Sequence, residues 1–356
     1  MSVVADKTTA PAAPDAQPSG WNMRRVLLLL LQGRTLLVFV LLLIVFSRLS
    51  PNYLSQSNVI VMTKHVSINA ILAIGLTFVI LTGGIDLSVG SIAGLTGMIT
   101  GGLLFEGLQG IGGYTIWFSA VAAIFIGLLL GAAVGALNGL LITRFRVAPF
   151  IATLGMLYVA RGFALLRSDG GTFPNLEGTK ARGNTGFKVI GVNRWLGLPV
   201  AVWIMIVVVI AAVIVTTRTP FGRRIYAVGG NERAARLAGI RINRVKVAAY
   251  MISGVCAALA GLLLTSELGA AYPNGAETYE LNAIAAAVLG GAALSGGKGT
   301  IIGTVMGAFV IGFLTDGLVL VDVSPFWQLI VKGGVIILAV VMEQAQQGVQ
   351  ARVAAG

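Results

Sequence analysis

The chain has 356 residues, of which 56% are hydrophobic and only 11% are charged, and its mean hydropathy is +0.91. This composition excludes both a soluble globular protein and a disordered one, because it provides enough apolar residues for about ten membrane helices of about 20 residues each. The net charge of +12 is typical of membrane proteins with basic cytoplasmic loops and does not indicate nucleic-acid binding. The 48 glycines favour close packing of membrane helices.

The N-terminal region precedes the first long apolar stretch. Residues 1–20 are rich in Ala, Pro and Thr, and we expect them to form a disordered cytoplasmic tail. Arg24 and Arg25 followed by a short Leu run superficially resemble a signal peptide. Because no small-residue cleavage site follows before the next apolar stretch, an interfacial helix over 21–31 is expected instead.

Apolar runs predict an all-α polytopic membrane protein with ten spanning helices. The predicted spans are 35–50, 62–82, 87–105, 115–141, 147–166, 199–217, 246–266, 280–295, 300–318 and 325–342. They lie in a transmembrane permease domain over 21–343, which leaves 344–356 as a C-terminal tail. Because ten is an even number, both termini should lie on the same side of the membrane.

The loop 218–246 determines the predicted orientation. Its only acidic residue is Glu232, and its basic residues are Arg218, Arg223, Arg224, Arg233, Arg236, Arg241, Arg244 and Lys246. Positive loops stay in the cytoplasm, so this loop and both termini are expected there. The loop 167–198 is then periplasmic, although it is also basic, because long loops do not have to follow this rule.

Two stretches of the sequence resemble each other. Aligning 69–94 with 282–307 gives ten identities in 26 positions, and both stretches read as apolar helix, glycine break, apolar helix. This pattern predicts a half-chain repeat, although the Ala, Gly and Leu bias of the chain is an alternative explanation. Transporters built from such repeats carry their substrate path at the repeat interface, near helices broken by glycine.

The sequence lacks the residue sets that enzymes use. Its one histidine, His65, is expected to be an interfacial residue, and its one cysteine, Cys256, is expected to pack in an apolar run. The glycine-rich stretch 296–300 lacks the Ser or Thr directly after Lys that a phosphate-binding loop needs. We therefore predict no catalytic residue, no metal ligand and no cofactor bound by this chain.

Few ionisable residues interrupt the predicted spans. Asp86 follows Gly83 and Gly84 and precedes Ser88, which predicts a helix break with Asp86 as the N-cap of the next span. The same interpretation applies to Glu280. A proton-driven carrier usually keeps buried relay residues, so their scarcity argues against one.

The segment after Gly230 contains the signals of a complete short helix. Asn231 would cap it, Glu232 lies in its first turn, Arg236 lies near its end, and Gly239 terminates it. So short a helix is not stable alone in water, so it should dock against something. A cytoplasmic partner protein fits, and a basic loop resting on anionic lipid is the alternative.

Five motifs together resemble the ribose/xylose-type sugar permeases of ATP-binding cassette (ABC) importers over about 35–343. The motifs are Gly83–Ser91, Arg161–Gly162, Gly229–Ile240, Tyr279–Ala286 and Leu289–Gly299. The resemblance implies a bacterial inner-membrane permease for a neutral monosaccharide such as ribose, xylose or galactose. It also implies a second permease copy, a cytoplasmic ABC ATPase that binds ATP and Mg, and a periplasmic sugar-binding protein.

The resemblance also suggests roles for particular residues. The loop that contacts the ATPase would include Gly230, Asn231, Glu232, Ala235, Arg236, Gly239 and Ile240. Because they lie in the repeated helices, the residues expected to line the translocation path are Asn69, Thr77, Phe78 and Asn282. Asn282 stands where many relatives carry an acid, so no ionic role is assigned to it.

Two other classes of function stay open from the sequence. A proton-coupled secondary sugar transporter would need a buried relay, so Asp86→Asn should abolish its uptake, whereas a helix cap should tolerate this change at modest cost. A membrane scaffold would dock partners through the basic loop but move no solute. Uptake into vesicles would separate that case.

Overall fold

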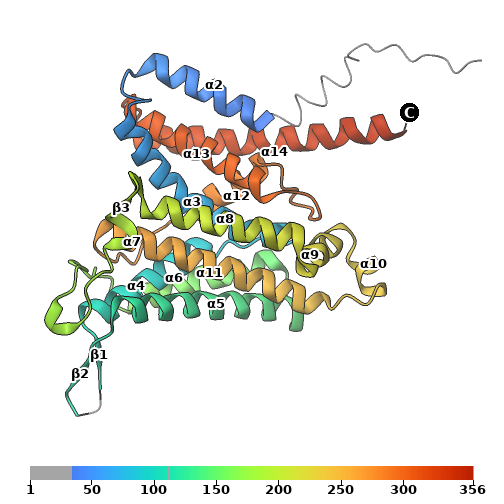
Figure 1. Ribbon diagram of the computed structural model, residues 1–356. Coiled ribbons are helices and arrows are strands. Elements are labelled where there is room, and N and C mark those ends of the chain that lie inside the picture. The colour runs from blue at the N-terminus through green and yellow to red at the C-terminus, as the bar shows by residue number, and fades with distance from the viewer. Residues whose placement is uncertain (1–33, 111, 356) are drawn as a thin grey trace, which may run out of the picture. The chain divides into compact units, whose positions relative to one another are not determined.

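The computed structural model describes residues 34–110 and 112–355, with side chains for 35–110, 112–338, 340 and 341. The expected tail 1–20 and interfacial helix 21–31 lie outside the described residues. The described chain is predominantly helical (Figure 1), and its strands form only two short antiparallel hairpins. These are β1 (Leu108–Gln109) with β2 (Thr115–Ile116) and β3 (Arg194–Trp195) with β4 (Leu198–Pro199). The predicted all-α polytopic fold is confirmed.

Six of the described helices are long and apolar enough to cross a membrane. They are α3 (Gln56–Leu81), α5 (Ala120–Arg144), α6 (Pro149–Leu166), α8 (Val200–Arg218), α11 (Ile242–Leu268) and α13 (Ile301–Leu320). Four more helices have shorter apolar stretches, namely α2 (Arg34–Leu49), α4 (Val89–Phe105), α12 (Tyr279–Leu289) and α14 (Pro325–Ala355). Together they make the ten apolar helices that the sequence predicts. The short helices are η1 (Lys180–Arg182), α7 (Val189–Val192), α9 (Pro220–Gly230) and α10 (Glu232–Leu237).

Four predicted boundaries were wrong. The span predicted over 62–82 begins earlier, at Gln56, where Ser55 caps the helix. The span predicted over 115–141 begins only at Ala120, because Thr115 and Ile116 pair in the first hairpin and Ser119 caps the helix. The span predicted over 280–295 ends at Leu289, and the non-helical stretch after it contains glycines with positive φ. The last helix continues through the expected tail to Ala355.

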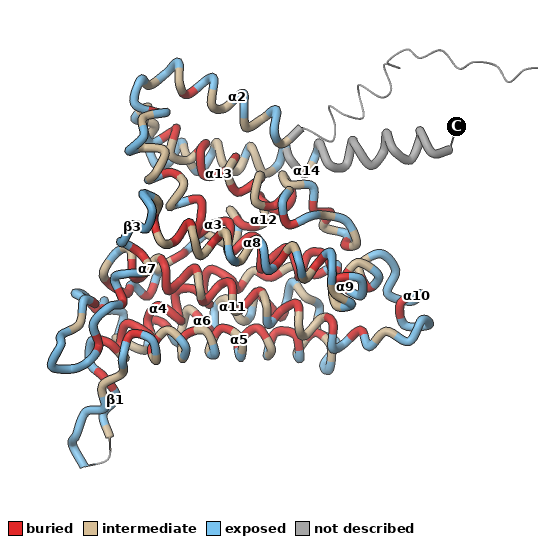
Figure 2. Tube along the Cα trace, viewed as in Figure 1, coloured by how far each residue is buried: buried red, intermediate tan, exposed pale blue. Residues whose placement is uncertain are grey.

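The long helix α11 lies at the centre of the bundle and packs against α5, α3 and α4. Figure 2 shows buried residues along these helices. Their backbones approach closely at glycines: a Cβ added at Gly131 would lie 2.4 Å from the oxygen of Gly254, and one added at Gly261 would lie 2.1 Å from the oxygen of Ala93. The glycine excess therefore serves helix packing, as expected in membranes.

The two ends of the bundle differ. The basic loop folds into α9, α10 and the start of α11 at one end, while the hairpins and the loop 167–198 lie at the other (Figure 1). The two stretches of the sequence repeat both fold as helix, break, helix. The first break, 82–88, joins α3 to α4, and the second, 290–300, joins α12 to α13.

Candidate functional site

The first helix break is built around the buried carboxylate of Asp86. Its Oδ1 accepts hydrogen bonds from the backbone N–H of Ser88 at 3.0 Å and from the Ser88 hydroxyl at 2.6 Å. Its Oδ2 accepts one from the Ser253 hydroxyl of α11 at 2.9 Å. Asn138 of α5 in turn donates to the Ser88 hydroxyl at 2.9 Å. Both carboxylate oxygens are thus satisfied without a counter-ion.

This geometry corrects the role expected for Asp86. The residue at the N-cap of α4 is Ser88, which makes no side-chain capping bond, and Asp86 lies two residues earlier. The carboxylate therefore closes the break and attaches it to α11, instead of capping the next helix. Likewise, Glu280 is not a cap: the cap position of α12 is Thr278, with φ +67°, and Glu280 lies in the first turn.

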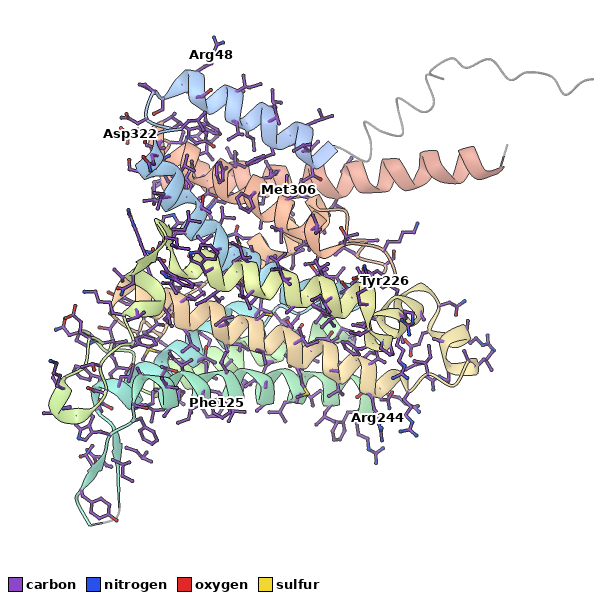
Figure 3. The ribbon with its side chains drawn as sticks, in the orientation of Figure 1. Arg48, Phe125, Tyr226, Arg244, Met306 and Asp322 are labelled. Carbon is purple, nitrogen blue, oxygen red and sulfur yellow. The ribbon has the colours of Figure 1, made fainter. Side chains whose placement is uncertain are left out.

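The two helix breaks meet each other at the end of the bundle that carries the basic loop. Gly297 of the second break donates its N–H to the carbonyl of Leu81, the last residue of α3, at 3.0 Å. Gly229 of α9 fits between them, since a Cβ there would lie 1.8 Å from the oxygen of Leu81 and 2.5 Å from the nitrogen of Gly297. The Tyr226 hydroxyl adds a bond to the carbonyl of Gly299 at 2.8 Å (Figure 3).

We name this contact of α9 with both breaks the glycine junction, comprising Leu81, Gly83, Gly229, Gly296 and Gly297. A Cβ at Gly296 would lie 2.8 Å from the nitrogen of Gly83, so backbone meets backbone throughout. Sequence reasoning singled out Gly230 and not Gly229. The signal available was only a glycine pair directly before a helix cap.

The short helix α10 follows the glycine junction immediately. Asn231 caps it, with its Oδ1 accepting the N–H of Ala234 at 2.9 Å, and Gly239 after it has φ +79°. Glu232 accepts hydrogen bonds from Arg236 at 3.4 Å and from Lys246 of α11 at 2.6 Å. The bond from Lys246 is the main cause that lowers the pKa of the Glu232 carboxyl below its ordinary value. These contacts fix α10 to the start of α11.

One face of α10 packs on the protein and the other is open. Ala235 is 4% exposed, whereas Leu237 is 85% exposed. Beside it, a cavity of about 530 Å³ lies between α9 and the start of α11, lined by Phe221, Arg224, Ala238, Gly239, Ile240, Arg241, Arg244, Val245 and Ala248. Figure 3 labels Arg244 at this end of the bundle. An exposed leucine beside a basic groove is suited to protein docking.

The residues expected to line a path divide into two groups. Thr77 and Phe78 are buried: the Thr77 hydroxyl bonds the Thr304 hydroxyl of α13 at 2.8 Å, and Phe78 is only 2% exposed in an apolar cluster. Both side chains join α3 to its neighbours by packing, and their place on a path stays a prediction. Asn69 and Asn282 are half-buried, and the Asn69 Oδ1 has no hydrogen-bond partner.

A charged cluster that the sequence did not predict joins α3, α11 and α13. Lys64 lies 2.9 Å from Glu267, and His65 Nδ1 lies 3.3 Å from Asp316. His65 is therefore part of an ionic network and not simply interfacial. These groups come from three helices far apart in sequence, so no local pattern could show them. No group of three or more residues that could hold a metal occurs among the described residues.

Comparisons with known proteins agree with the motifs. The family model described as branched-chain amino acid transport system / permease component matches residues 58–340. The ribose import permease protein RbsC of Bacillus subtilis (strain 168) is 46% identical over 312 residues, covering 88% of this chain and 92% of the relative. No solved structure gives a significant match.

Other relatives extend the comparison. RbsC of Escherichia coli (strain K12) is 41% identical over 325 residues, covering 89% of this chain and 95% of the relative. The xylose transport system permease protein XylH of the same organism is 35% identical over 347 residues, covering 82% of this chain and 86% of the relative. With its apolar helices, the chain is a multi-pass membrane protein and belongs to the sugar permeases of ABC importers, which are transport components and not enzymes.

Proposed function

We propose that the chain forms the path for a neutral monosaccharide, of the ribose, xylose or galactose type, in an ATP-driven importer of the bacterial inner membrane. A periplasmic binding protein delivers the sugar, and a cytoplasmic ABC ATPase binds ATP and Mg and supplies the energy. Two copies of the permease pair within the lipid bilayer. Both termini and the loop 218–246 lie in the cytoplasm. Ribose is the sugar named for the relatives with the higher identities.

The observation that carries the coupling step is the glycine junction. The ATPase docks on the exposed face of α10, around Leu237, and α9 connects this helix to both helix breaks within a few residues. A push on α10 therefore reaches the end of α3 and the break that leads into α13 without crossing a flexible linker. Because a partner can shift a conformational equilibrium only by binding one state better, its contact with α10 differs between the inward-open and outward-open forms.

The experiment that tests this proposal is co-purification of the tagged permease with its ATPase in mild detergent. Leu237→Asp places a charge on the exposed docking face while leaving the buried Ala235 in place. We expect it to release the ATPase and to abolish ATP-dependent uptake. The matched control is Leu196→Asp, because Leu196 is 76% exposed at the opposite end, in the β3–β4 turn, where its φ of +51° suits Asp.

The outcomes separate the alternatives. Coupling through α10 is supported if the ATPase co-purifies with the wild type and with Leu196→Asp but not with Leu237→Asp. If the wild-type protein brings no ATPase and takes up sugar only with a proton gradient, the secondary-carrier alternative replaces the proposal. If the ATPase stays bound to Leu237→Asp, α10 is not the coupling helix.

A further inference from the structure

Helix α12 crosses only part of the membrane. Its 11 residues span about 16 Å, against about 30 Å for the hydrocarbon core. The segment 271–278 before it is not helical, and it begins at Ala271, which pairs with Phe173 of the loop 167–198. The chain therefore enters the bundle as a non-helical segment of successive turns and becomes helical only at Tyr279.

This non-helical segment descends along the glycine face of α4. A Cβ at Gly101 would lie 2.5 Å from the Cβ of Ala271, and a Cβ at Gly90 would lie 2.6 Å from the oxygen of Ala276. From Gly101 to Gly90 the helix rises about 16 Å, so the segment reaches deep into the membrane. Non-helical backbone at such depth is tolerated only where it is buried in protein or lines a water-filled cavity.

Arg161 of α6 holds the segment in place. Its Nη1 donates hydrogen bonds to the carbonyls of Pro273 and Gly275, the latter at 3.1 Å. Within the described part of the chain, its Nε and Nη2 make no hydrogen bond to protein. A partly buried guanidinium with free donors inside a membrane bundle is a functional candidate, since such residues face pathways or partners.

Glu280 supplies the complementary group. Its Oε2 is buried and has no hydrogen-bond partner, and it lies against Gly90, where a Cβ would approach it to 2.2 Å. Arg161 Nη1 lies against Gly94 in the same way, at 2.8 Å. Because Gly90 and Gly94 are one turn apart on α4, the unpartnered Glu280 oxygen and the Arg161 guanidinium are separated by about 6 Å along the helix axis.

The backbone between these two groups is strained. Ala276 and Thr278 have φ values of +56° and +67°, a region that costs a residue with a side chain about 1 kcal/mol or more. Strain of this kind persists where surrounding contacts impose it, and it concentrates at ligand clamps. The Glu280 Oε2 without a hydrogen-bond partner lies at the end of this strained segment.

We propose that Arg161 and Glu280 form a hydrogen-bonding station for the sugar halfway across the membrane. A neutral polyhydroxylated molecule carries donors and acceptors together, so it can accept from the guanidinium while donating to the carboxylate. This inference rests on the proposed function and names the residues that the substrate meets. The proposed sugar path then runs along the face shared by α4, α6 and α12, and not past Thr77 and Phe78.

The test uses the permease reconstituted in vesicles with its ATPase and binding protein, with radiolabelled ribose as the probe. The variants are Glu280→Gln and Arg161→Gln, and the control is Asp322→Asn, an exposed carboxylate in the turn after α13 with a φ of +58°. We expect uptake to fall at least about tenfold in the two station variants, because a site built to bind hydroxyls suffers when one polar partner changes. ATP hydrolysis should continue in both, and the control should transport normally.

A second measurement, of thiol reactivity, does not require the Glu280→Gln and Arg161→Gln variants to fold. The thiol introduced by Glu277→Cys should react with a membrane-impermeant reagent, and ribose-loaded binding protein should slow this reaction. The native Cys256 is buried and stays unreactive. The control is Phe125→Cys, on a 61% exposed position of α5 that points away from the bundle (Figure 3), where no reaction is expected.

The results that overturn the station differ from those that overturn the transport function. Wild-type vesicles that neither take up ribose nor hydrolyse ATP contradict the proposed function itself. Active wild-type vesicles with normal uptake by both station variants contradict only the station. If uptake and ATP hydrolysis fall together in folded variants, Arg161 and Glu280 have a structural role and the inference is overturned. The inference is also overturned if ribose-loaded binding protein does not protect the Glu277→Cys thiol.

Discussion

Asp86 and Glu280 are two carboxylates beside interrupted membrane helices, and they differ in burial and in hydrogen bonding. Asp86 is fully buried, and its oxygens accept three hydrogen bonds from Ser88 and Ser253. Glu280 is half-buried, and its Oε2 has no partner. Since an unpaired polar group in a low-dielectric interior is costly, the first carboxylate stabilises the fold and the second is free to act on a ligand.

The difference arises from what surrounds each interruption. The first break is enclosed by α5, α6 and α11, and the last two also donate to the carbonyl of Ile85, through Thr153 and Tyr250. The segment before α12 is held by Arg161 through its backbone carbonyls, not through the Glu280 side chain. Similar sequence signals, an acid at the expected start of a span, thus lead to an anchor in one place and an open polar group in the other.

The largest effect is expected at the glycine junction, which joins the break beside Asp86 to the break after α12. Gly229→Ala would place a Cβ 1.8 Å from the oxygen of Leu81, so the backbone of α9 or of a break must move. We expect a loss of more than about 4 kcal/mol in the free energy of unfolding. Thermal unfolding in detergent measures it, and Gly230→Ala is the matched control because nothing lies within 4 Å of that position. Equal stability of the two variants would mean that α9 does not pack against the two breaks.

The comparison itself is tested by removing each carboxylate. Asp86→Ala leaves the Ser88 N–H and two hydroxyls without their acceptor, which should lower the free energy of unfolding by about 3 kcal/mol. Glu280→Ala removes only a first-turn acid, which should cost less than about 1 kcal/mol. Denaturation of the two purified variants under one condition gives both values. A loss at Glu280 as large as at Asp86 would mean that both carboxylates are structural.

Ser253→Ala is a milder test of the Asp86 anchor. It removes one hydrogen bond to a charged group, which should cost about 2 kcal/mol. Ser47→Ala is the control, because the Ser47 hydroxyl bonds only a carbonyl of its own helix. In the Asp86→Ala background the Ser253 change should add little, since the shared partner is already gone. Full additivity would show that Ser253 stabilises the fold by another route.

The sequence predicted the helices well because each depends on a local signal. Hydropathy located the ten apolar helices, and the cap at Asn231 located α10. The early end of α12 was missed because it depends on where Gly290, Gly296 and Gly297 meet other backbones. A glycine in an apolar run is equally compatible with a packed helix and with a break, so the pattern alone cannot separate them.

The candidate sites were predictable only where one segment contains them. The proposed coupling loop is a single stretch, so its residues could be named in advance. Arg161 and Glu280 lie 119 positions apart in the sequence and meet only through the glycine face of α4. Thr77 and Phe78 were assigned to a path because they lie in the repeat, but repetition does not say which face of a helix is covered.

The smallest effect is expected at a third carboxylate, Glu232, which is exposed and paired. Lys246 lowers the pKa of this group, so the pair stabilises α10 at neutral pH and loses its effect as the pH falls below the ordinary Glu value of about 4.3. With 44% of the side chain exposed, solvent limits the contribution to about 0.5 kcal/mol. Hydrogen exchange of α10 in wild type and Glu232→Gln should therefore differ slightly at pH 7 and converge under acid. A difference that grows on acidification would mean that Lys246 is not the controlling partner.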